Sequence, residues 1–127
     1  MMERAMVPTL FVIASCDRCR AAIRWMRDQG HPFLIHDMRQ DGLDSERLHT
    51  WLQYAGPDKI LNRSSTTWRN LDPTQKASID QSIDQSIDQG AIISLLLQYP
   101  TLIKRPILET HRGLTQGFDP IDYGRIL

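Results

Sequence analysis

The most regular pattern of hydrophobic and polar residues lies near the N-terminus, over residues 8–30. The run at residues 9–14 is short, apolar and rich in β-branched side chains, which is typical of a buried strand. From Asp17 onward apolar residues recur three or four positions apart, which predicts an amphipathic helix that ends at Gly30. The expected apolar face of this helix consists of Cys19, Ala22, Ile23 and Met26.

A second apolar run, at residues 32–37, follows this helix and predicts another short strand. Because a single helix connects the two strands, we expect them to be parallel and joined by a right-handed crossover. The first third of the chain therefore predicts a βαβ unit.

The middle of the chain, residues 44–100, is predicted to be mainly helical. Asp44 is expected to cap a helix that ends at Gly56 and Pro57. Residues 58–72 are largely polar and irregular, so they predict a loop that contains one helical turn.

A tetrapeptide, Ser-Ile-Asp-Gln, occurs three times in succession over residues 78–89. A helix is expected to begin at Asp72 and Pro73, and on it a period of four places the isoleucines in a slowly drifting apolar stripe. This period is too short for a solenoid unit, so we expect a surface helix and assign the repeat no chemistry. Gly90 separates it from a strongly apolar helix predicted over residues 91–98.

The last part of the chain predicts a β-hairpin and a closing helix. Residues 102–108 predict an extended strand, residues 109–113 a turn and residues 114–116 a second short strand. Asp119 and Pro120 suit the N-cap and the first turn of a helix, so a final helix is expected from there to the C-terminus.

The only two cysteines, Cys16 and Cys19, stand where the first predicted strand ends and the first helix begins. The first turn of a helix has unpaired backbone N–H groups and the positive end of the helix dipole, and both favour a thiolate. Arg18 and Arg20 add positive charge nearby. We therefore expect Cys16 to be the exposed, more acidic nucleophile and Cys19 to be a more buried, candidate resolving thiol.

Two other interpretations of the cysteines stay open. A CxxC pair is half of a zinc knuckle, but a structural zinc usually needs four ligands. The other candidate ligands are scattered along the chain; they are His31, His36, His49 and His111. The cysteines could also be inert core residues, since free cysteine is often buried. A CxxC between a strand and a helix favours redox chemistry over both alternatives.

The composition limits the class of protein. A chain of 127 residues is long enough for one domain with its own core. Fifteen basic residues balance fifteen acidic ones, which argues against direct binding to nucleic acid or an anionic membrane. No signal-peptide pattern or apolar segment of about 18 residues is present, so we expect a cytoplasmic protein whose two cysteines form a working dithiol.

Five stretches, in order along the chain, resemble the ArsC/Spx family of arsenate reductase-like proteins, and most closely its YffB-like branch. They are Ser15-Cys-Asp-Arg-Cys19 and residues 36–44, 61–69, 102–108 and 117–120. The resemblance extends from about residue 9 to the end of the chain.

The resemblance implies a thioredoxin-like α/β fold with a four-stranded mixed sheet. A βαβ half and a ββα half would form this sheet, with a helical insertion between them. Under this interpretation residues 1–127 are a single domain. Its thioredoxin-like core comprises residues 9–43 and 101–127, and the insertion comprises residues 44–100.

The resemblance also implies residue roles. Cys16 matches the family's nucleophilic cysteine, and Pro106 matches the cis-proline that faces it. Arg63 and Arg105 match the family's anion-binding arginines. Two guanidinium groups beside a helix N-terminus can bind oxyanion or carboxylate oxygens and keep a thiol ionised. Arg105 also needs a partner or a ligand because it lies within an apolar run.

Pro106 and three further residues next to these positions, Ser15, Asn62 and Lys104, are expected to help bind the substrate. Arsenate reductases of the family place another arginine in the segment that corresponds to residues 116–118. Here that segment is Gln-Gly-Phe, which argues against arsenate as the substrate.

The expected function is that of a glutathione-dependent thiol reductase, in which Cys16 attacks an oxidised thiol substrate and glutathione or Cys19 resolves the intermediate. Glutathione is expected as a co-substrate, and no bound cofactor or metal is expected. The alternative is an Spx-like redox-sensing transcriptional regulator that binds RNA polymerase. In that case the same CxxC would serve as the sensor.

Overall fold

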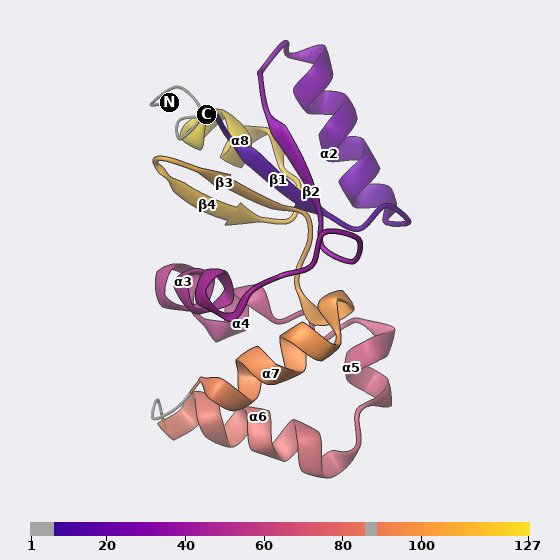
Figure 1. Cartoon of the computed structure of the whole chain (residues 1–127), viewed down its shortest axis with the longest axis vertical. Helices are drawn as coiled ribbons and strands as arrows, with labels where there is room; N and C mark the ends of the chain where they lie inside the picture. Colours follow the sequence, from indigo (N-terminus) through magenta and orange to yellow (C-terminus); the bar gives the residue numbers. More distant parts are fainter. Residues whose placement is uncertain (1–6, 86–88) are drawn as a thin grey trace. The chain divides into compact units, whose positions relative to one another are not determined.

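The computed structural model describes residues 7–85 and 89–127 (Figure 1). The chain divides into two compact units. The first consists of the chain up to Gly42 together with Lys104–Leu127, and the second consists of Leu43–Ile103.

The first unit is an α/β unit around one mixed sheet. Its strands are β1 (Thr9–Val12), β2 (Leu34–Asp37), β3 (Ile107–Thr110) and β4 (Gly113–Gln116). They pair in the order β2-β1-β3-β4, with β1 parallel to β2, β3 antiparallel to β1, and β4 antiparallel to β3. The predicted parallel βαβ unit and four-stranded mixed sheet are therefore confirmed.

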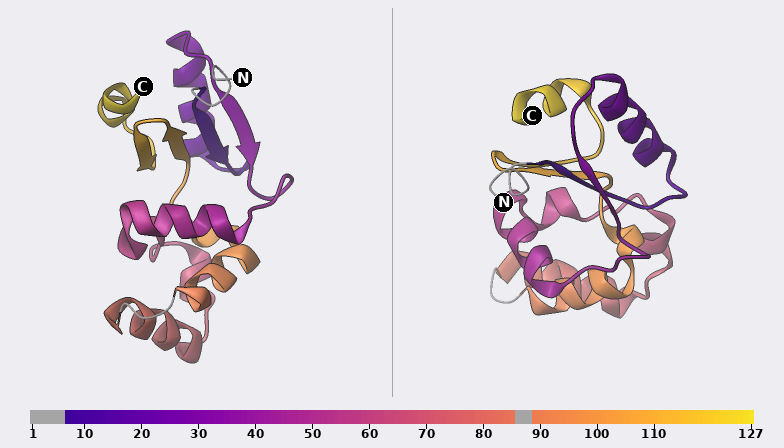
Figure 2. Two further views of the ribbon diagram at one scale, coloured as in Figure 1. Left: turned by 60° about the vertical axis from the view of Figure 1, so that its left-hand side comes forward. Right: turned by 45° about the horizontal axis from the view of Figure 1, so that its top comes forward.

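Two helices, α2 (Asp17–Asp28) and α8 (Pro120–Ile126), cover one face of this sheet (Figure 2). Leu10 and Val12 of β1 and Leu108 of β3 form the sheet side of the core. The helices contribute the remaining buried side chains of this core, which are Cys19, Ala22, Met26 and Tyr123. The apolar residues of α2 that recur three or four positions apart therefore face the sheet, as expected.

The local signals that start and end these helices act as predicted. Asp119 caps α8, because its carboxylate accepts a hydrogen bond of 2.9 Å from the Ile121 N–H. Gly30, just after α2, has a φ of 72°, a left-handed conformation that glycine adopts without strain.

The predicted hairpin is present but shifted along the chain. The first strand, expected over residues 102–108, covers only Ile107–Thr110, and the turn lies at residues 111–112. Leu102 ends a 3-10 turn and Ile103 forms an isolated bridge to Leu61, so this apolar pair belongs to the second unit. The apolar run in the sequence thus combined residues from two units.

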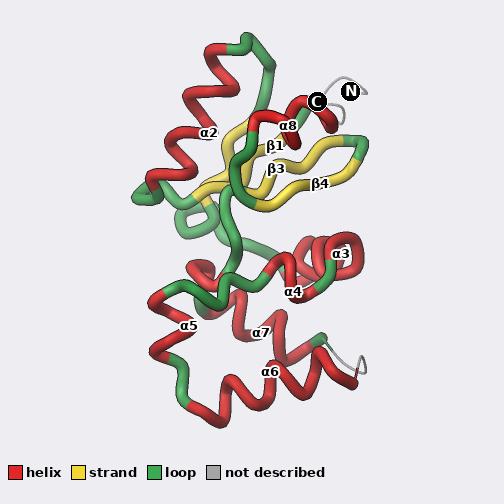
Figure 3. The backbone as a smooth tube through the Cα atoms, turned by 180° about the vertical axis from the view of Figure 1, so that it is seen from behind, coloured by secondary structure: helices red, strands yellow, loops and turns green. Residues whose placement is uncertain are grey.

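The second unit is helical (Figure 3). Its helices are α3 (Ser45–Ala55), α4 (Pro57–Ile60), α5 (Thr66–Asn70), α6 (Pro73–Gln85), α7 (Gly90–Gln98) and the 3-10 helix η1 (Pro100–Leu102). Asp44 caps α3 as predicted, by accepting a hydrogen bond of 2.7 Å from the Arg47 N–H. Trp51, Ile60 and Leu96 are each fully buried in this unit.

Residues 58–72 are more regular than predicted. α3 ends before Gly56 and Pro57, as predicted, and Pro57 also begins α4, where its fixed φ suits a first turn. Ser65 then begins α5 by accepting a hydrogen bond of 3.1 Å from the Trp68 N–H. The segment is therefore two short helices with a turn between them.

The first two copies of the repeated tetrapeptide lie in α6. Ile79 of the first copy is 2% exposed and Ile83 of the second is partly buried, which agrees with an apolar stripe. Ile87 of the third copy lies outside the described residues.

Candidate functional site

Cys16 lies between β1 and α2, in the position that the sequence predicted. Its N–H donates a hydrogen bond of 3.0 Å to the carbonyl of Ile13, which closes a tight turn after β1. Cys16 is the N-cap residue of α2 and has extended backbone angles, with φ −89° and ψ 123°. Its side chain is partly exposed, so the sulfur stands at the start of the helix with access to solvent.

The surroundings of Cys16 favour its thiolate. Partial burial raises the pKa of the thiol, but the combined effect of its neighbours is a pKa below the ordinary value. Hydrogen bonding from the Cys19 N–H and thiol contributes most to the lowering, followed by the charge of Arg105 and the Arg18 N–H. The Arg18 and Cys19 N–H groups belong to the first turn of α2, where unpaired N–H groups stabilise a charged sulfur.

Cys19 has the opposite electrostatic character. Its side chain is 1% exposed and packs in the core of the first unit. Burial raises its pKa to about 12, and the neighbouring Cys16 contributes to the rise. At neutral pH Cys19 is therefore a thiol that can donate a hydrogen bond to the Cys16 thiolate.

Arg105 and Pro106 belong to the same unit as the cysteines. The Arg105–Pro106 peptide bond is cis, as the resemblance implied. The charge of Arg105 lowers the pKa of both Cys16 and Cys19, so its guanidinium lies within electrostatic reach of both sulfurs. The structure thus groups Cys16, Cys19 and Arg105 as the sequence analysis expected.

Gly117 and Tyr123 were not predicted as site residues from the sequence. The Gly117 N–H donates a hydrogen bond of 2.8 Å to the Pro106 carbonyl, and the Tyr123 hydroxyl donates one of 2.9 Å to the Gly117 carbonyl. Burial raises the pKa of Tyr123, and the proximity of Cys19 adds to the rise. The glycine in the Gly117-Phe-Asp-Pro120 motif was the one available signal for this connection.

Arg63 belongs to the second unit, where it has partners of its own. Its guanidinium forms an ion pair of 2.9 Å with Asp80 and one of 3.5 Å with Asp58. It also lies over the ring of Trp68, 5.4 Å from the ring centroid. Asp80 belongs to the first copy of the tetrapeptide repeat, so this copy has a structural role that the sequence did not suggest. The role of Arg63 in anion binding stays a prediction.

The other predicted substrate-binding residues have varied surroundings. Ser15 is exposed in the turn before Cys16, and Lys104 is exposed immediately before Arg105. Asn62 instead organises its own loop, because its side-chain oxygen accepts hydrogen bonds from the Ser64 N–H at 3.2 Å and hydroxyl at 2.8 Å. A substrate-binding role for each of these residues stays a prediction.

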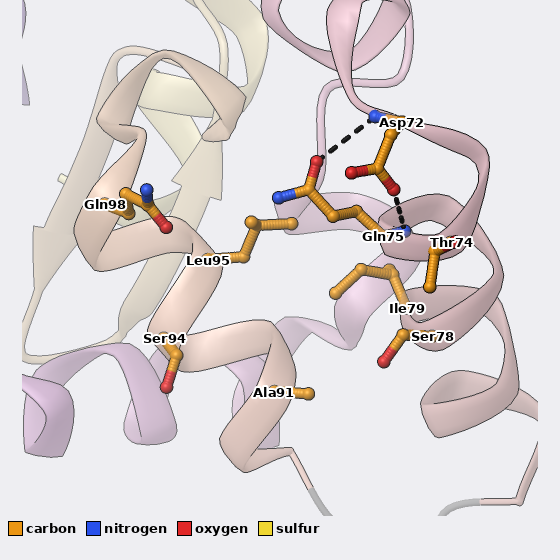
Figure 4. A pocket seen from close by; sticks show the side chains of 9 residues that line it. All are labelled: Asp72, Thr74, Gln75, Ser78, Ile79, Ala91, Ser94, Leu95 and Gln98. Carbon is orange, nitrogen blue, oxygen red and sulfur yellow. Dashed lines mark hydrogen bonds between the residues drawn. The ribbon is translucent and has the colours of Figure 1, made fainter.

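A separate cleft of about 340 Å³ lies in the second unit, beside α6 and α7 (Figure 4). Asp72, its one carboxylate, caps α6 by accepting a hydrogen bond of 2.8 Å from the Gln75 N–H, and the Gln75 side chain accepts one of 3.1 Å from the Asp72 N–H. The rest of the lining is hydroxyl, amide or apolar, and comprises Thr74, Ser78, Ile79, Ala91, Ser94, Leu95 and Gln98. Among the residues that the structure describes, the lining of the cleft therefore offers no thiol or imidazole for catalysis.

The part of the chain that the structure describes has neither a metal cluster nor a membrane-spanning helix. Within it, no cluster of three or more histidine, cysteine or acidic side chains is close enough to hold a metal ion. Within the same residues, no helix has the length and apolar character needed to cross a membrane.

The protein belongs to the thioredoxin-like class. It has the mixed sheet of that class, a cysteine at the start of the first helix and a cis-proline before β3. The chain belongs to the ArsC family, which its sequence matches over residues 11–126.

Three relatives illustrate this membership. The solved structure of the YffB protein is 34% identical, with a TM-score of 0.83 over 95% of this chain and 99% of that one. The solved structure of an arsenate reductase (ArsC) related protein from Brucella melitensis is 31% identical, with a TM-score of 0.70 over 95% and 94% of the two chains. The global transcriptional regulator Spx of Streptococcus pneumoniae is 31% identical over 87% of this chain and 78% of its own. The family thus includes relatives named for reductase and for regulatory functions.

Proposed function

We propose that this protein is a thiol-dependent oxidoreductase of the ArsC family, with Cys16 as its nucleophile and glutathione as its reductant. One observation carries the proposal: Cys16 is a partly exposed thiol at a helix N-terminus, with a pKa that its neighbours lower. A low pKa in an accessible position distinguishes reactive cysteines from buried structural ones. The similarity to an arsenate reductase related protein supports the same class of chemistry.

The proposed reaction is the reduction of a disulfide in three thiol-disulfide exchange steps. The Cys16 thiolate attacks one sulfur of the substrate disulfide, forms a mixed disulfide with that half, and releases the other half as a thiolate, which takes up a proton. A glutathione thiolate then attacks the mixed disulfide and restores Cys16. A second glutathione reduces the resulting adduct, so that two glutathione thiols become one glutathione disulfide for each substrate disulfide reduced.

The surroundings of Cys19 favour an external thiol as the resolving group. Its side chain is 1% exposed and its pKa is about 12, so almost none of it is thiolate at neutral pH. Its hydrogen bond to the Cys16 sulfur gives it a different role, which is to stabilise the attacking and leaving thiolate of Cys16.

Arg105 is proposed to stabilise the Cys16 thiolate and to bind the substrate. Its guanidinium already lowers the pKa of Cys16, and it can also bind an anionic group of the disulfide. Arg63 is proposed as a second anion-binding residue on the strength of the family resemblance. To act in this way it would have to exchange its ion pair with Asp80 for one with the substrate.

Turnover measurements with several substrates test the proposal. Glutathione, glutathione reductase and NADPH would be supplied with a glutathionylated peptide, 2-hydroxyethyl disulfide or arsenate. We expect the wild type and Cys19→Ser to reduce the glutathionylated peptide, and Cys16→Ser to lose at least about 100-fold in rate. Equal turnover by Cys16→Ser would refute the assignment of the nucleophile. Reduction of arsenate as fast as the peptide disulfide would refute the substrate class.

A second candidate function is redox-sensitive regulation of transcription, which the 31% identity to Spx favours. Oxidation of Cys16 and Cys19 would change the surface around the start of α2, and RNA polymerase would bind one redox state. Immobilised wild-type protein, reduced or oxidised, would be tested for capture of purified RNA polymerase, with the Cys16→Ser, Cys19→Ser double variant as the control. Equal capture by both redox states would eliminate this candidate.

A further inference from the structure

Arg18 is a charged residue at the site to which the proposed reaction gives no role. It lies two residues after Cys16, in the first turn of α2, and its side chain is exposed. A Cβ atom placed on Gly117 would lie 3.9 Å from its terminal Nη1 nitrogen, so the guanidinium reaches the loop between β4 and α8. Within the described residues, 7–85 and 89–127, Arg18 forms no hydrogen bond or ion pair through its side chain. It therefore presents its charge to solvent beside Gly117.

The surroundings of Gly117 connect this charge to the reacting sulfur. The Gly117 N–H is bonded to the carbonyl of Pro106, the residue that follows Arg105. Arg105 acts on the Cys16 sulfur through its charge, whereas Arg18 acts on it only through its backbone N–H. The approach of Arg18 to Gly117, the Gly117–Pro106 hydrogen bond and the Arg105–Pro106 peptide bond therefore connect Arg18 to Arg105 within the first unit. The guanidinium of Arg105 acts on the Cys16 thiolate, and that of Arg18 is available to the substrate.

We infer that Arg18 is a specificity-determining residue, whose guanidinium binds a carboxylate of the peptide disulfide that reacts at Cys16. This inference rests on the proposed function and deepens it, since it assigns the substrate class as anionic peptide disulfides. A guanidinium suits a carboxylate because it can donate two parallel hydrogen bonds to the two oxygens. Gly117 has a φ of 81° and no side chain, so the surface next to Arg18 stays open to a substrate backbone.

Rates of mixed-disulfide formation at Cys16 test the inference. Oxidised glutathione is the anionic probe and 2-hydroxyethyl disulfide is the neutral one, and adduct formation is followed by mass spectrometry. The variants are Arg18→Gln, Arg18→Lys and Arg24→Gln. Arg24 is the matched control because it is an exposed arginine on the same helix and its substitution changes the net charge equally.

We expect Arg18→Gln to lower the rate with oxidised glutathione by about five- to tenfold, while the rate with the neutral disulfide changes by less than about twofold. Arg18→Lys should recover part of the loss, since it keeps the charge without the two-pronged geometry. Arg24→Gln should behave like the wild type with both probes. The pH at which the neutral disulfide reaches half of its maximal rate should be the same in Arg18→Gln and the wild type.

The outcomes separate the inference from the function on which it rests. If Arg18→Gln slows both probes equally, or neither, the inference is overturned, and a shifted pH profile would show that Arg18 acts on the thiol instead. If Arg24→Gln matches Arg18→Gln, the effect is one of overall charge and the inference also fails. If wild-type Cys16 forms no adduct with either probe although iodoacetamide alkylates it, the proposed function itself is refuted.

Discussion

At the scale of single residues, the charge on Cys16 depends on several groups that each act by a different physical mechanism. Backbone N–H groups of the first helical turn, the Cys19 thiol and the Arg105 guanidinium all stabilise the thiolate, and together they outweigh the effect of partial burial. We therefore expect that no single substitution abolishes the lowering of the Cys16 pKa. Substitution of each group should change this pKa by a different mechanism.

The positive charge of Arg105 is the contribution to the Cys16 pKa that a single substitution removes most cleanly. Arg105→Gln should raise the pKa of Cys16, because it removes the positive charge that favours the thiolate. Arg105→Lys should restore much of the lowering. The measurement is the rate of iodoacetamide alkylation of Cys16 against pH, with Arg24→Gln as the control for overall charge. An unchanged midpoint in Arg105→Gln would contradict the assigned role.

The contribution of Cys19 depends on a hydrogen-bond donor. Cys19→Ser keeps a donor beside Cys16, whereas Cys19→Ala removes it, so the pKa of Cys16 should be higher in Cys19→Ala than in Cys19→Ser. Absorbance of the thiolate near 240 nm, measured against pH, reports this difference. A pKa of Cys16 that is the same in both variants would mean that the Cys19 thiol is only a packing group.

At the scale of helices and strands, α8 holds the loop at Gly117 in position next to the cis-Pro106 segment. Tyr123 is fully buried, makes edge-to-face contacts with Trp25 of α2 and with Phe118, and donates its hydrogen bond to the Gly117 carbonyl. The aromatic contacts attach α8 to α2, and the hydroxyl attaches α8 to the loop.

Tyr123→Phe should separate these two effects, since it keeps the ring and removes only the hydroxyl. We expect it to lower the free energy of unfolding by about 1 kcal/mol, the usual net contribution of one such hydrogen bond. Tyr123→Ala also empties a core position, and its cost should be about 3–5 kcal/mol. Urea unfolding under reducing conditions measures both. Equal costs for the two variants would show that the ring packing contributes nothing.

The elements also show what could be predicted from the sequence. Asp44, Asp72 and Asp119 cap α3, α6 and α8 in the way that their residue types predicted, because capping is a local interaction. The first strand of the hairpin was misplaced because Leu102 and Ile103 are apolar for a different reason: they pack in the second unit. A pattern of apolar residues shows that a segment is buried, but not against which part of the protein.

At the scale of the whole molecule, titration of the buried groups should make stability depend on pH. The folded state raises the pKa of Cys19 and Tyr123, so it holds their protons to a higher pH than the unfolded chain does. Their contribution to stability is therefore complete below the unfolded pKa values, about 8.5 and 10, and is lost as the pH rises. Cys16 has the opposite sign, because its contribution is lost as the pH falls through its lowered folded pKa.

The free energy of unfolding should consequently decline between about pH 8.5 and pH 12 in the wild type. The decline should be smaller in Tyr123→Phe, which has one buried proton fewer to lose. Urea unfolding at several pH values, with a reductant present, checks this. Identical declines in the two proteins would contradict the account.

The sequence allowed the class of fold and the placement of the two cysteines between a strand and a helix to be predicted, but not the other contacts around them. The CxxC at a helix start is a local pattern, whereas Arg105 could be grouped with the two cysteines only through the resemblance to the family. The contact of Arg18 with the Gly117 loop and the pairing of Arg63 with Asp80 could not be predicted, since each joins residues distant in sequence. Neither contact has a local signature.

The central claim is that Cys16 is a stabilised thiolate that reacts as the nucleophile. Its most direct test is the rate of Cys16 alkylation by iodoacetamide against pH, read at the Cys16 peptide by mass spectrometry, in the wild type and in Cys19→Ala. The account predicts a midpoint below that of an ordinary thiol, about 8.5, and a higher midpoint in the variant. A midpoint at or above the ordinary value in the wild type, unchanged in the variant, would contradict it.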